Sequence, residues 1–243
     1  MSLTAKKVVV VGGTSGLGLA TAQAAAKEGA QVVIAGSRQA RLDRAMTTLP
    51  GNASGSVVDV TREAQVGRFF EQIGPFDHLI YTAGDKLHVE DIDSMSIAHA
   101  QRLFAVRYWG AFAAVKYGAR NIRAGGSIVL TSGGVSQRPW KGASVSASMC
   151  GAVESLMRAL AIELAPIRVN LVQPGLVKTD LWDAMAPDAR QAMYERRAES
   201  LPVGYVGEAA DVAEAYLYLM RERFSTGATL VVDGGAAISQ PRR

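Results

Sequence analysis

Short apolar runs alternate along the chain with longer segments in which apolar residues recur at helical spacing. Near-continuous apolar runs of four or five residues are typical of strands that helices cover on both faces of a parallel sheet. The expected strands are 7–11, 31–35, 56–58, 78–81, 127–131, 168–172 and 229–232. The expected helices are 17–28, 38–47, 63–73, 98–119, 142–164 and 208–222.

Regular alternation of strands and helices predicts a doubly wound α/β fold with right-handed crossovers. No linker rich in proline or serine and no repeat divides the chain, so one domain over residues 1–243 is expected. Only segment 179–206, rich in methionine, alanine and charge, breaks the alternation. It is either a substrate flap or a helical insertion at the surface.

Composition and charge narrow the function classes. The formal net charge of +4 is scattered in isolated pairs, so the sequence does not indicate a nucleic-acid partner. Cys150 is the only cysteine, which favours a reducing compartment. The N-terminal apolar run is too short for a signal peptide, and we expect no run of the roughly 18 apolar residues that a membrane span needs. The chain is therefore predicted to be cytoplasmic, without a membrane partner and without a metal site.

A glycine-rich turn follows the first expected strand and opens the first expected helix. Its sequence is Gly12-Gly13-Thr14-Ser15-Gly16-Leu17-Gly18, with the spacing Gly-x3-Gly-x-Gly. Glycines let the backbone turn sharply and let a pyrophosphate approach the helix N-terminus, where free N–H groups and the helix dipole meet the anion. At the end of the first strand of a parallel sheet this turn predicts a dinucleotide site.

The second strand ends in Ala35-Gly36-Ser37-Arg38, and no Asp or Glu occurs from position 31 to position 42. A carboxylate at this place favours the ribose 2′-hydroxyl of NAD, whereas a cation favours the 2′-phosphate of NADP. A guanidinium offers paired hydrogen bonds to phosphate oxygens, and Ser37 and Arg41 can add contacts. The sequence therefore predicts NADP(H), with Asp59 after the third strand on the adenine amino group.

The chain resembles the short-chain dehydrogenase/reductase family over essentially its whole length. The matching motifs are GGTSGLG at 12–18, DVT at 59–61, Ala83-Gly84, GSIVLTS at 126–132, RVNLVQPGLVKT at 168–179 and TGATLVVDGG at 226–235. The resemblance implies a Rossmann-type sheet of about seven parallel strands with helices on both faces, and a homo-oligomer, either a tetramer or a dimer. The implied cofactor-binding residues are Gly12, Thr14, Ser15, Gly16, Leu17, Gly18, Ser37, Arg38, Asp59, Val60, Ala83, Gly84, Pro174, Gly175, Val177 and Thr179.

In this family a tyrosine exchanges a proton with the substrate, a lysine four residues later lowers its pKa from roughly 10, and a serine bonds the substrate oxygen. Ser132 matches the serine. Counting forward from Ser132 puts Val145 and Met149 in the tyrosine and lysine places, whereas aligning GAVESL puts Ser146 and Cys150 there. Neither register gives the pair, and residues 142–177 contain no tyrosine and no lysine.

Two further departures accompany this gap. The family's Asn-Asn-Ala-Gly is Tyr81-Thr82-Ala83-Gly84, and the helix asparagine of the proton relay is replaced by Arg107. Arg107 stays protonated, so it can bind an anion or a carbonyl oxygen but is a poor proton donor. It could instead pair with a carboxylate at a subunit interface.

Two functions remain open at the level of sequence. The first is an oxidoreductase of altered chemistry that acts on a small, largely apolar carbonyl, imine or enone, with Ser132, Arg107 and Ser146 as the expected catalytic residues. Other candidate proton donors are Tyr81, Lys141, Tyr194 and Tyr205, and the apolar residues expected at the mouth are Trp140, Met149, Trp182 and Met185. The second function is an inactive NADP(H)-binding sensor or partner subunit. Because the cofactor residues look complete through the nicotinamide end, the oxidoreductase is favoured.

Overall fold

Seven strands form one parallel sheet in the computed structural model, which describes residues 2–85 and 88–239. The strand order is β3-β2-β1-β4-β5-β6-β9. The strands are β1 (Lys7–Val11), β2 (Gln31–Gly36), β3 (Ser54–Val57), β4 (Phe76–Tyr81), β5 (Ile122–Thr131), β6 (Arg168–Pro174) and β9 (Thr229–Val232). The doubly wound α/β fold expected from the sequence is thereby confirmed.

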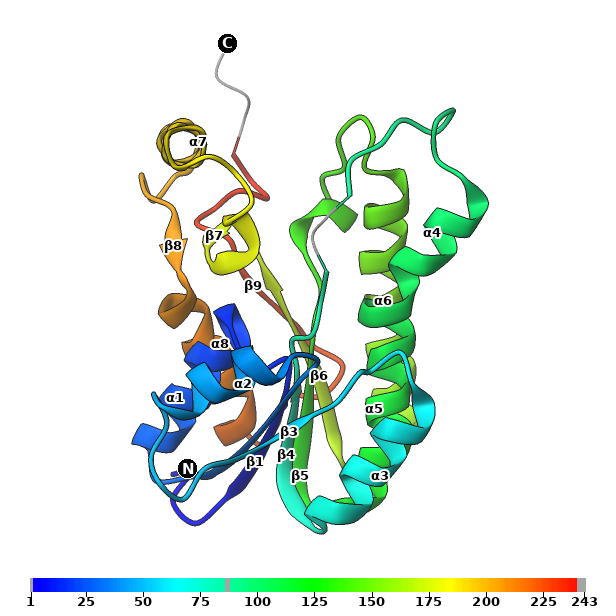
Figure 1. Cartoon of the computed structure of the whole chain (residues 1–243), viewed down its shortest axis with the longest axis vertical. Helices are drawn as coiled ribbons and strands as arrows, with labels where there is room; N and C mark the ends of the chain where they lie inside the picture. The colour runs from blue at the N-terminus through cyan, green and yellow to red at the C-terminus, as the bar shows by residue number, and fades with distance from the viewer. Residues whose placement is uncertain (1, 86–87, 240–243) are drawn as a thin grey trace.

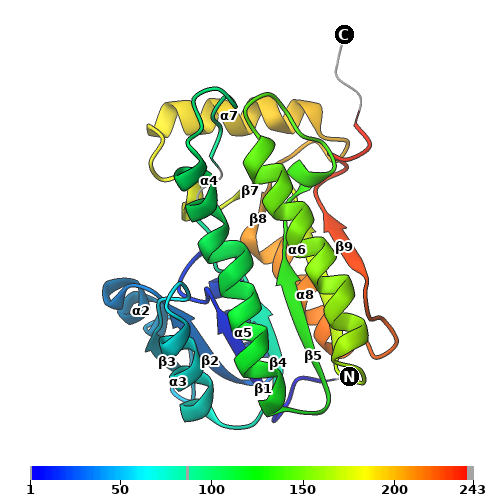
Figure 2. The ribbon, with the colours of Figure 1, turned by 90° about the vertical axis from the view of Figure 1, so that its right-hand side faces the viewer.

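Helices cover both faces of this sheet (Figure 1). One face carries α1 (Gly16–Lys27), α2 (Gln39–Met46) and α8 (Ala209–Arg221), and the other carries α3 (Glu63–Ile73), α5 (Gly110–Gly118) and α6 (Ser144–Glu163). α4 (Ile97–Phe104) runs into α5, and both lie beside α6 when the molecule is turned (Figure 2). The structure is a three-layer α/β/α arrangement.

Side chains that alternate along the strands fill the two cores. On β1, Val9 and Val11 belong to the core on the α3, α5 and α6 side, whereas Val8 and Val10 belong to the core on the α1 and α8 side. All four are buried, which explains why the strand is a continuous apolar run rather than an alternating one. β1 and β4 are neighbours in the sheet, while β2 lies on the other side of β1, so the chain reverses direction across the sheet between them. Ligands of doubly wound folds bind at the carboxyl ends of strands beside such a reversal.

Two elements differ from the sequence expectation. β5 begins at Ile122, five residues before the apolar run, because Phe76 of β4 pairs with Ile122 across an irregular register. The helix expected over 98–119 is interrupted by a π-helical turn, Ala105–Trp109, between α4 and α5. Such turns insert one residue into an α-helix and occur frequently at functional sites. Arg107 lies in this turn.

The segment that breaks the alternation contains a short strand pair and a helix. β7 (Val177–Lys178) pairs with β8 (Gly207–Glu208), and α7 (Pro187–Ser200) lies between them in sequence. Figures 1 and 2 show α7 beyond the carboxyl ends of the strands, on the same side as the loop before α4. A helix in this place is compatible both with a substrate flap and with a helical insertion at the surface.

α6 is long and apolar enough to cross a membrane by length and composition, although serine, glutamate and arginine residues interrupt its apolar sequence. The core helix of a water-exposed fold passes the same test. In this structure Val153, Met157 and Leu160 of α6 are buried in the core beside the sheet. Packing against the sheet therefore accounts for the apolar face of the helix.

Candidate active site

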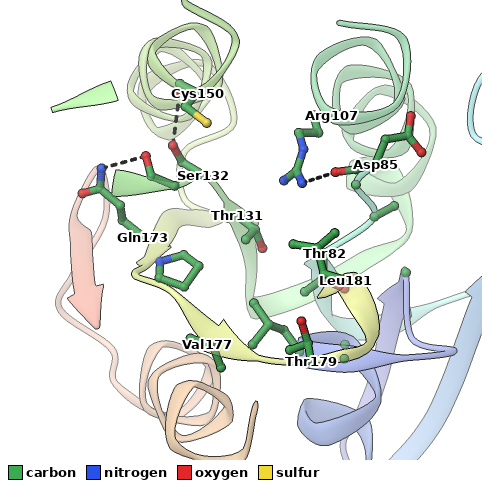
Figure 3. A pocket seen from close by; sticks show the side chains of 18 of the residues that line it. Thr82, Asp85, Arg107, Thr131, Ser132, Cys150, Gln173, Val177, Thr179 and Leu181 are labelled. Carbon is green, nitrogen blue, oxygen red and sulfur yellow. Dashed lines mark hydrogen bonds between the residues drawn. The ribbon is translucent and has the colours of Figure 1, made fainter. Parts of the chain in front are cut away.

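A cavity of about 1030 Å³ opens at the carboxyl ends of the strands. Residues from the β1–α1 turn, the ends of β2, β4, β5 and β6, and the segment after β6 line it, and Figure 3 shows part of this lining. Every cofactor-binding residue predicted from the sequence lines this one cavity. Among residues 2–85 and 88–239, no group of three His, Cys, Asp or Glu side chains is placed to hold a metal ion.

The glycine turn at one end of the cavity leaves no room for side chains. Gly12 has a φ of +90°, and a Cβ there would lie 2.4 Å from the backbone nitrogen of Ala83. A Cβ on Gly18 would lie 2.3 Å from the carbonyl oxygen of Gly12. Ser15, at the N-cap of α1, makes no side-chain capping bond. The N-terminus of α1 therefore offers uncapped N–H groups to the cavity, and the backbone at Gly12 and Gly18 is bare, which suits a pyrophosphate.

Basic residues stand at the end of β2. Ser37 and Arg38 line the cavity and are exposed, and Arg41, in the first turn of α2, lines it as well. Arg41 Nη1 is 3.5 Å from Asp180 Oδ2, so an ion pair links α2 to the segment after β7. Asp59 accepts hydrogen bonds from the backbone and the hydroxyl of Thr61, and the hydroxyl bond is the main cause that lowers the pKa of its carboxyl group. Asp59 is thus ionised and fixed at the edge of the cavity.

Ser132 stands at the opposite end of the cavity, directly after β5. Its side chain is buried at 4% exposure, and its Oγ lies 2.9 Å from Glu154 Oε1 and 3.2 Å from the carbonyl oxygen of Cys150. Ser136 and Gln173 also donate to Glu154 Oε1, at 2.5 and 3.4 Å. Ser132 is therefore held by α6, through a carboxylate that lies behind it as seen from the cavity.

Arg107 approaches the same space from the π-helical turn. Its guanidinium packs on the backbone of Gly84, where a Cβ would lie 2.6 Å from Cζ, and Nη2 donates to the carbonyl oxygen of Asp85 at 2.5 Å. Figure 3 shows Arg107 and Cys150 on helices on either side of the cavity. The glycine at position 84 leaves room for the Arg107 guanidinium, and the π-helical turn directs it there, so the cavity wall carries a fixed positive charge.

The side chains of α6 differ in whether they line the cavity. Cys150 lines it, whereas Val145 and Ser148 line a groove on the outer side of the helix and Met149 is buried beside Val135. Of the four residues considered for the tyrosine and lysine places, Val145, Ser146, Met149 and Cys150, only Cys150 lines the cavity in the part of the chain that the structure describes. Burial raises the pKa of the Cys150 thiol, so the group is neutral at pH 7 and does not replace the lysine charge.

Ser146 does not reach the cavity in the part of the chain that the structure describes. Its side chain is buried at 3% exposure, and Oγ donates to the carbonyl oxygen of His88 at 2.8 Å. The turn of α6 that carries Ser146 faces the loop before α4, so the structure gives no support to the prediction of Ser146 as a catalytic residue. Its hydroxyl ties that loop to the helix.

The other candidate donors are also placed elsewhere. Tyr81 is buried and donates to the carbonyl oxygen of Val106, and burial raises the pKa of its phenol. Burial likewise raises the pKa of Tyr194, which packs with Leu201 and Val206. Tyr205 is exposed, and Lys141 pairs with Asp91 at 3.2 Å. Among the described residues that line the cavity, none is a tyrosine or a lysine.

The mouth differs in part from the expectation. Trp140 and Trp182 line the cavity, whereas Met149 lies in the core and Met185 lies outside the lining. Sequence reasoning missed Glu154 and Gln173. Glu154 follows Cys150 by four residues, the spacing of one helix face, so this signal was available. Gln173 carried no comparable signal, because it lies inside an apolar strand.

Comparison with known proteins bears on this geometry. A family model described as enoyl-(acyl carrier protein) reductase matches residues 11–237. The short-chain dehydrogenase/reductase ucsE of Acremonium sp is 36% identical over 98% of this chain and 97% of its own. A crystal structure of a small-chain dehydrogenase in complex with NADPH is similar at 40% identity and a TM-score of 0.85, covering 97% of this chain and all of the other. The MalC reductase/Diels-Alderase of Malbranchea aurantiaca is similar at 29% identity and a TM-score of 0.90, covering 96% of this chain and 97% of its own.

The parallel sheet and the cavity at its carboxyl edge define the class: a nucleotide-binding α/β protein of the Rossmann type. The extent of the matches then gives the family. This chain belongs to the short-chain dehydrogenase/reductase family and is an oxidoreductase of that type. The resemblance inferred from the sequence motifs is confirmed at this level.

Proposed function

We propose that this protein is an NADP(H)-dependent oxidoreductase for a small, largely apolar carbonyl, imine or enone substrate, and that its acid–base chemistry does not use the Tyr-x3-Lys pair. The observation that carries the cofactor assignment is the end of β2. Ser37 and Arg38 line the cavity there, and no carboxylate occurs from position 31 to position 42. The similar small-chain dehydrogenase at 40% identity is a complex with NADPH, which supports the same choice for this chain.

The residues of the cavity fit a dinucleotide. The Gly12 and Gly18 backbone and the uncapped N-terminus of α1 would hold the pyrophosphate, Arg38 the 2′-phosphate, and Val177 and Thr179 the nicotinamide end. When bound, NADPH supplies the hydride. The protein's contribution is to position the substrate and to compensate the charge that develops on it.

Arg107 is the polar group suited to compensating that charge, and Ser132 is suited to binding the oxygen or hydroxyl group of the substrate. Arg107 is a permanent cation held against Gly84 and Asp85, so it stabilises negative charge on a substrate oxygen without losing its proton. Ser132 presents its hydroxyl oxygen to the same cavity. Trp140 and Trp182 add apolar surface, which favours a largely apolar ligand.

The tyrosine and lysine of the family are absent from residues 142–177, and Cys150 lines the cavity instead. General acid catalysis typically contributes about 10²–10⁴-fold, so a site without the tyrosine suits substrates that need little proton transfer or an alternative relay. The similar MalC protein is named a reductase/Diels-Alderase, which supports reduction as the reaction type for this chain.

A binding and turnover experiment tests the proposal. Fluorescence titration is expected to give a Kd for NADPH about 10–100-fold below that for NADH, since a charge-assisted contact is worth roughly 1.5–3 kcal/mol. Arg38→Ala is expected to remove this preference by weakening NADPH alone. A panel of ketones, imines and enones is then screened for NADPH consumption. Tight NADPH binding without turnover of any class would favour the sensor or partner-subunit function, and equal Kd values would refute the role of Arg38.

Two further proposals concern assembly and location. An outer groove beside α4 and α6 has exposed apolar side chains, among them Ile92, Ile97 and Trp109, and an apolar surface of this kind supports a homo-oligomer, a dimer or tetramer. Light scattering after size-exclusion chromatography measures the state directly. The cytoplasmic location, with neither nucleic acid nor membrane as partner, remains a prediction that fractionation of the native cells would test.

A further inference from the structure

We propose that Glu154 is a positioning residue of this site, which exchanges the proton of Ser132 with solvent in place of the family's tyrosine, lysine and asparagine relay. This inference rests on the proposed oxidoreductase function and adds its proton path. It also selects, among the proposed substrates, an alcohol–carbonyl pair, because only such a pair gains or loses an O–H proton at the reacting group.

The Ser132 hydroxyl group can point its proton in two directions. Its single proton has two acceptors, the Glu154 carboxylate at 2.9 Å and the Cys150 carbonyl oxygen at 3.2 Å. A hydrogen bond to an ionised oxygen is roughly twice as strong as a neutral one. The proton therefore points to Glu154, behind the cavity wall, and the lone pairs of Ser132 Oγ face the cavity. Ser132 is then an acceptor for a substrate hydroxyl group.

The two oxygens of the Glu154 carboxylate differ in their surroundings. Oε1 of Glu154 accepts hydrogen bonds from the side chains of Ser132, Ser136 and Gln173. No donor to Oε2 occurs among residues 2–85 and 88–239, yet no buried side-chain oxygen in this part of the chain lacks a partner. Glu154 itself is half-buried, so we take Oε2 as the oxygen through which the carboxylate exchanges a proton with water. In this proposal the carboxylate connects Ser132 with solvent.

Gln173 and Ser136 fix this connection. Gln173 is fully buried, and its Nε2 also donates to Ser136 Oγ at 3.1 Å and to the Gly133 carbonyl oxygen at 3.2 Å. Its own Oε1 accepts from Gln137 at 2.9 Å. This network fixes the carboxylate and the loop after β5 in one geometry, as a proton path requires.

The proton transfer balances in the direction of oxidation. The alcohol C–H bond breaks, and its hydrogen leaves with the electron pair to NADP⁺. The alcohol O–H proton passes to Ser132 Oγ as the Ser132 proton passes to Glu154, which gives a carbonyl compound, NADPH and a carboxylic acid. Glu154 then loses its proton to water through Oε2. In reduction the same steps run backward, and the Glu154 carboxylic acid supplies the proton.

The other ionisable groups around Ser132 do not perform this exchange. Arg107 remains charged, and burial raises the pKa of the Cys150 thiol so that it stays neutral. The Tyr81 hydroxyl donates to the Val106 carbonyl and does not line the cavity. Glu154 is the one carboxylate that the described side chains join to Ser132.

The test replaces Glu154 by glutamine. Glu154→Gln keeps an oxygen that can accept from Ser132 but cannot take up its proton. With the alcohol–ketone pair that the wild-type protein converts fastest, kcat is expected to fall about 100-fold and its pH dependence to flatten. The Kd for NADPH is expected to stay within about twofold, because Glu154 does not line the cavity. In a single oxidative turnover, infrared difference spectra are expected to show a new carboxylic acid band in the wild type and none in the variant.

Two variants control for a structural effect. Glu163→Gln changes an exposed carboxylate on the same helix and is expected to match the wild type. Ser136→Ala removes a donor to Glu154 but keeps the contact with Ser132, so kcat is expected to fall by less than about threefold. If Ser136→Ala matches Glu154→Gln, the carboxylate only holds the loop, and the inference is wrong.

The remaining outcomes separate this inference from the proposed function. Turnover in Glu154→Gln with the wild-type pH profile overturns the proton path and leaves the oxidoreductase function intact. Turnover of imines or enones alone has the same consequence, because no O–H proton is then exchanged. A wild-type protein that binds NADPH and converts no compound of the panel overturns the proposed function, and the proton path with it.

Discussion

The two ends of the cavity are built in different ways. The nucleotide end is mostly backbone: the turn from Gly12 to Gly18 and the uncapped N-terminus of α1, with Arg38 as its main charged side chain. The reaction end is mostly side chains from separate elements, namely Ser132 after β5, Arg107 in the π-helical turn, Cys150 on α6, and Glu154 behind Ser132. The residues of the first end carry the glycine spacing predicted from the sequence, and those of the second end include neither a tyrosine nor a lysine among the described residues that line the cavity.

Under the proposed function, this difference means that the fold keeps its cofactor site while the chemistry of the reaction end changes. Backbone geometry at the nucleotide end depends on missing Cβ atoms, so almost any substitution there meets other backbone atoms. At the reaction end each group is one side chain on a rigid element, so a single replacement alters the chemistry and leaves the scaffold in place. The predictions below test whether the two ends can be perturbed separately.

The largest effect is expected from Gly18→Val. A Cβ at this position would lie 2.3 Å from the Gly12 carbonyl oxygen and 2.4 Å from Thr82 Oγ1, and valine adds two further carbons. The glycine turn must therefore move. We expect NADPH affinity to fall on the order of 1,000-fold, because a clash with backbone atoms is among the overpacking changes that cost the most free energy. Fluorescence titration measures the Kd, and circular dichroism checks that the variant is folded.

Gly51→Val is the matched control, because a Cβ there meets nothing within 4 Å. It is expected to bind NADPH as the wild type does. An equal loss of affinity in both variants would mean that the valine acts on the fold as a whole and not on the nucleotide end.

The next prediction concerns the loss of stability of the fold at acid pH, which must be told apart from any loss of turnover at the reaction end. His78 is buried on β4, with Nδ1 2.9 Å from Ser127 Oγ, and burial lowers its pKa from 6.5 to about 4. Arg168 and Lys6 act in the same direction, whereas Asp77 opposes them. Because the unfolded chain takes up this proton first, stability is expected to fall as the pH decreases from about 6.5 to about 4, by up to roughly 3 kcal/mol.

His78→Asn keeps a polar partner for Ser127 and removes the titration. Denaturant unfolding at several pH values is expected to show a shallower loss of stability in this variant over that window. An unchanged slope would assign the acid sensitivity to other groups. If turnover also falls between about pH 6.5 and about pH 4, its pH dependence is measured on this variant, in which the titration of His78 no longer contributes.

The smallest effect is expected from Gly84→Ala, at the boundary between the two ends. A Cβ there would lie 2.6 Å from Cζ of Arg107, the far end of a flexible side chain, so the guanidinium moves and the fold loses less than about 1 kcal/mol. Displacing a charged group by about 1 Å is expected to lower turnover about 10-fold, while the Kd for NADPH changes less than about threefold. A Kd that rises as much as turnover falls would show that the two ends are not separable.

Several details of the site were accessible from sequence, and others were not. The Gly12–Gly18 turn and the Ser37-Arg38 pair are local signals, and the structure brings them to one cavity as expected. The π-helical turn at Arg107 could not be predicted, because the apolar pattern of 98–119 is continuous and the insertion is set by packing, with Gly110 against the hydroxyl of Tyr81. The sequence could not show that Ser146 lies outside the cavity lining, because a helix of known position still has an unknown rotation.

By itself, the sequence determined where the seven strands of the sheet lie and where the glycine turn falls, because apolar periodicity and glycine spacing act over a few neighbouring residues. It also determined that residues 142–177 hold neither tyrosine nor lysine. Only the tertiary structure decided which face of α6 meets the cavity, since that depends on contacts between Cys150, Glu154 and Ser132, residues on two elements. The rotation of a packed helix is fixed by the side chains of its neighbours, so the contact between Ser132 and Glu154, on which the proposed proton path rests, was visible only once the helix lay against the sheet.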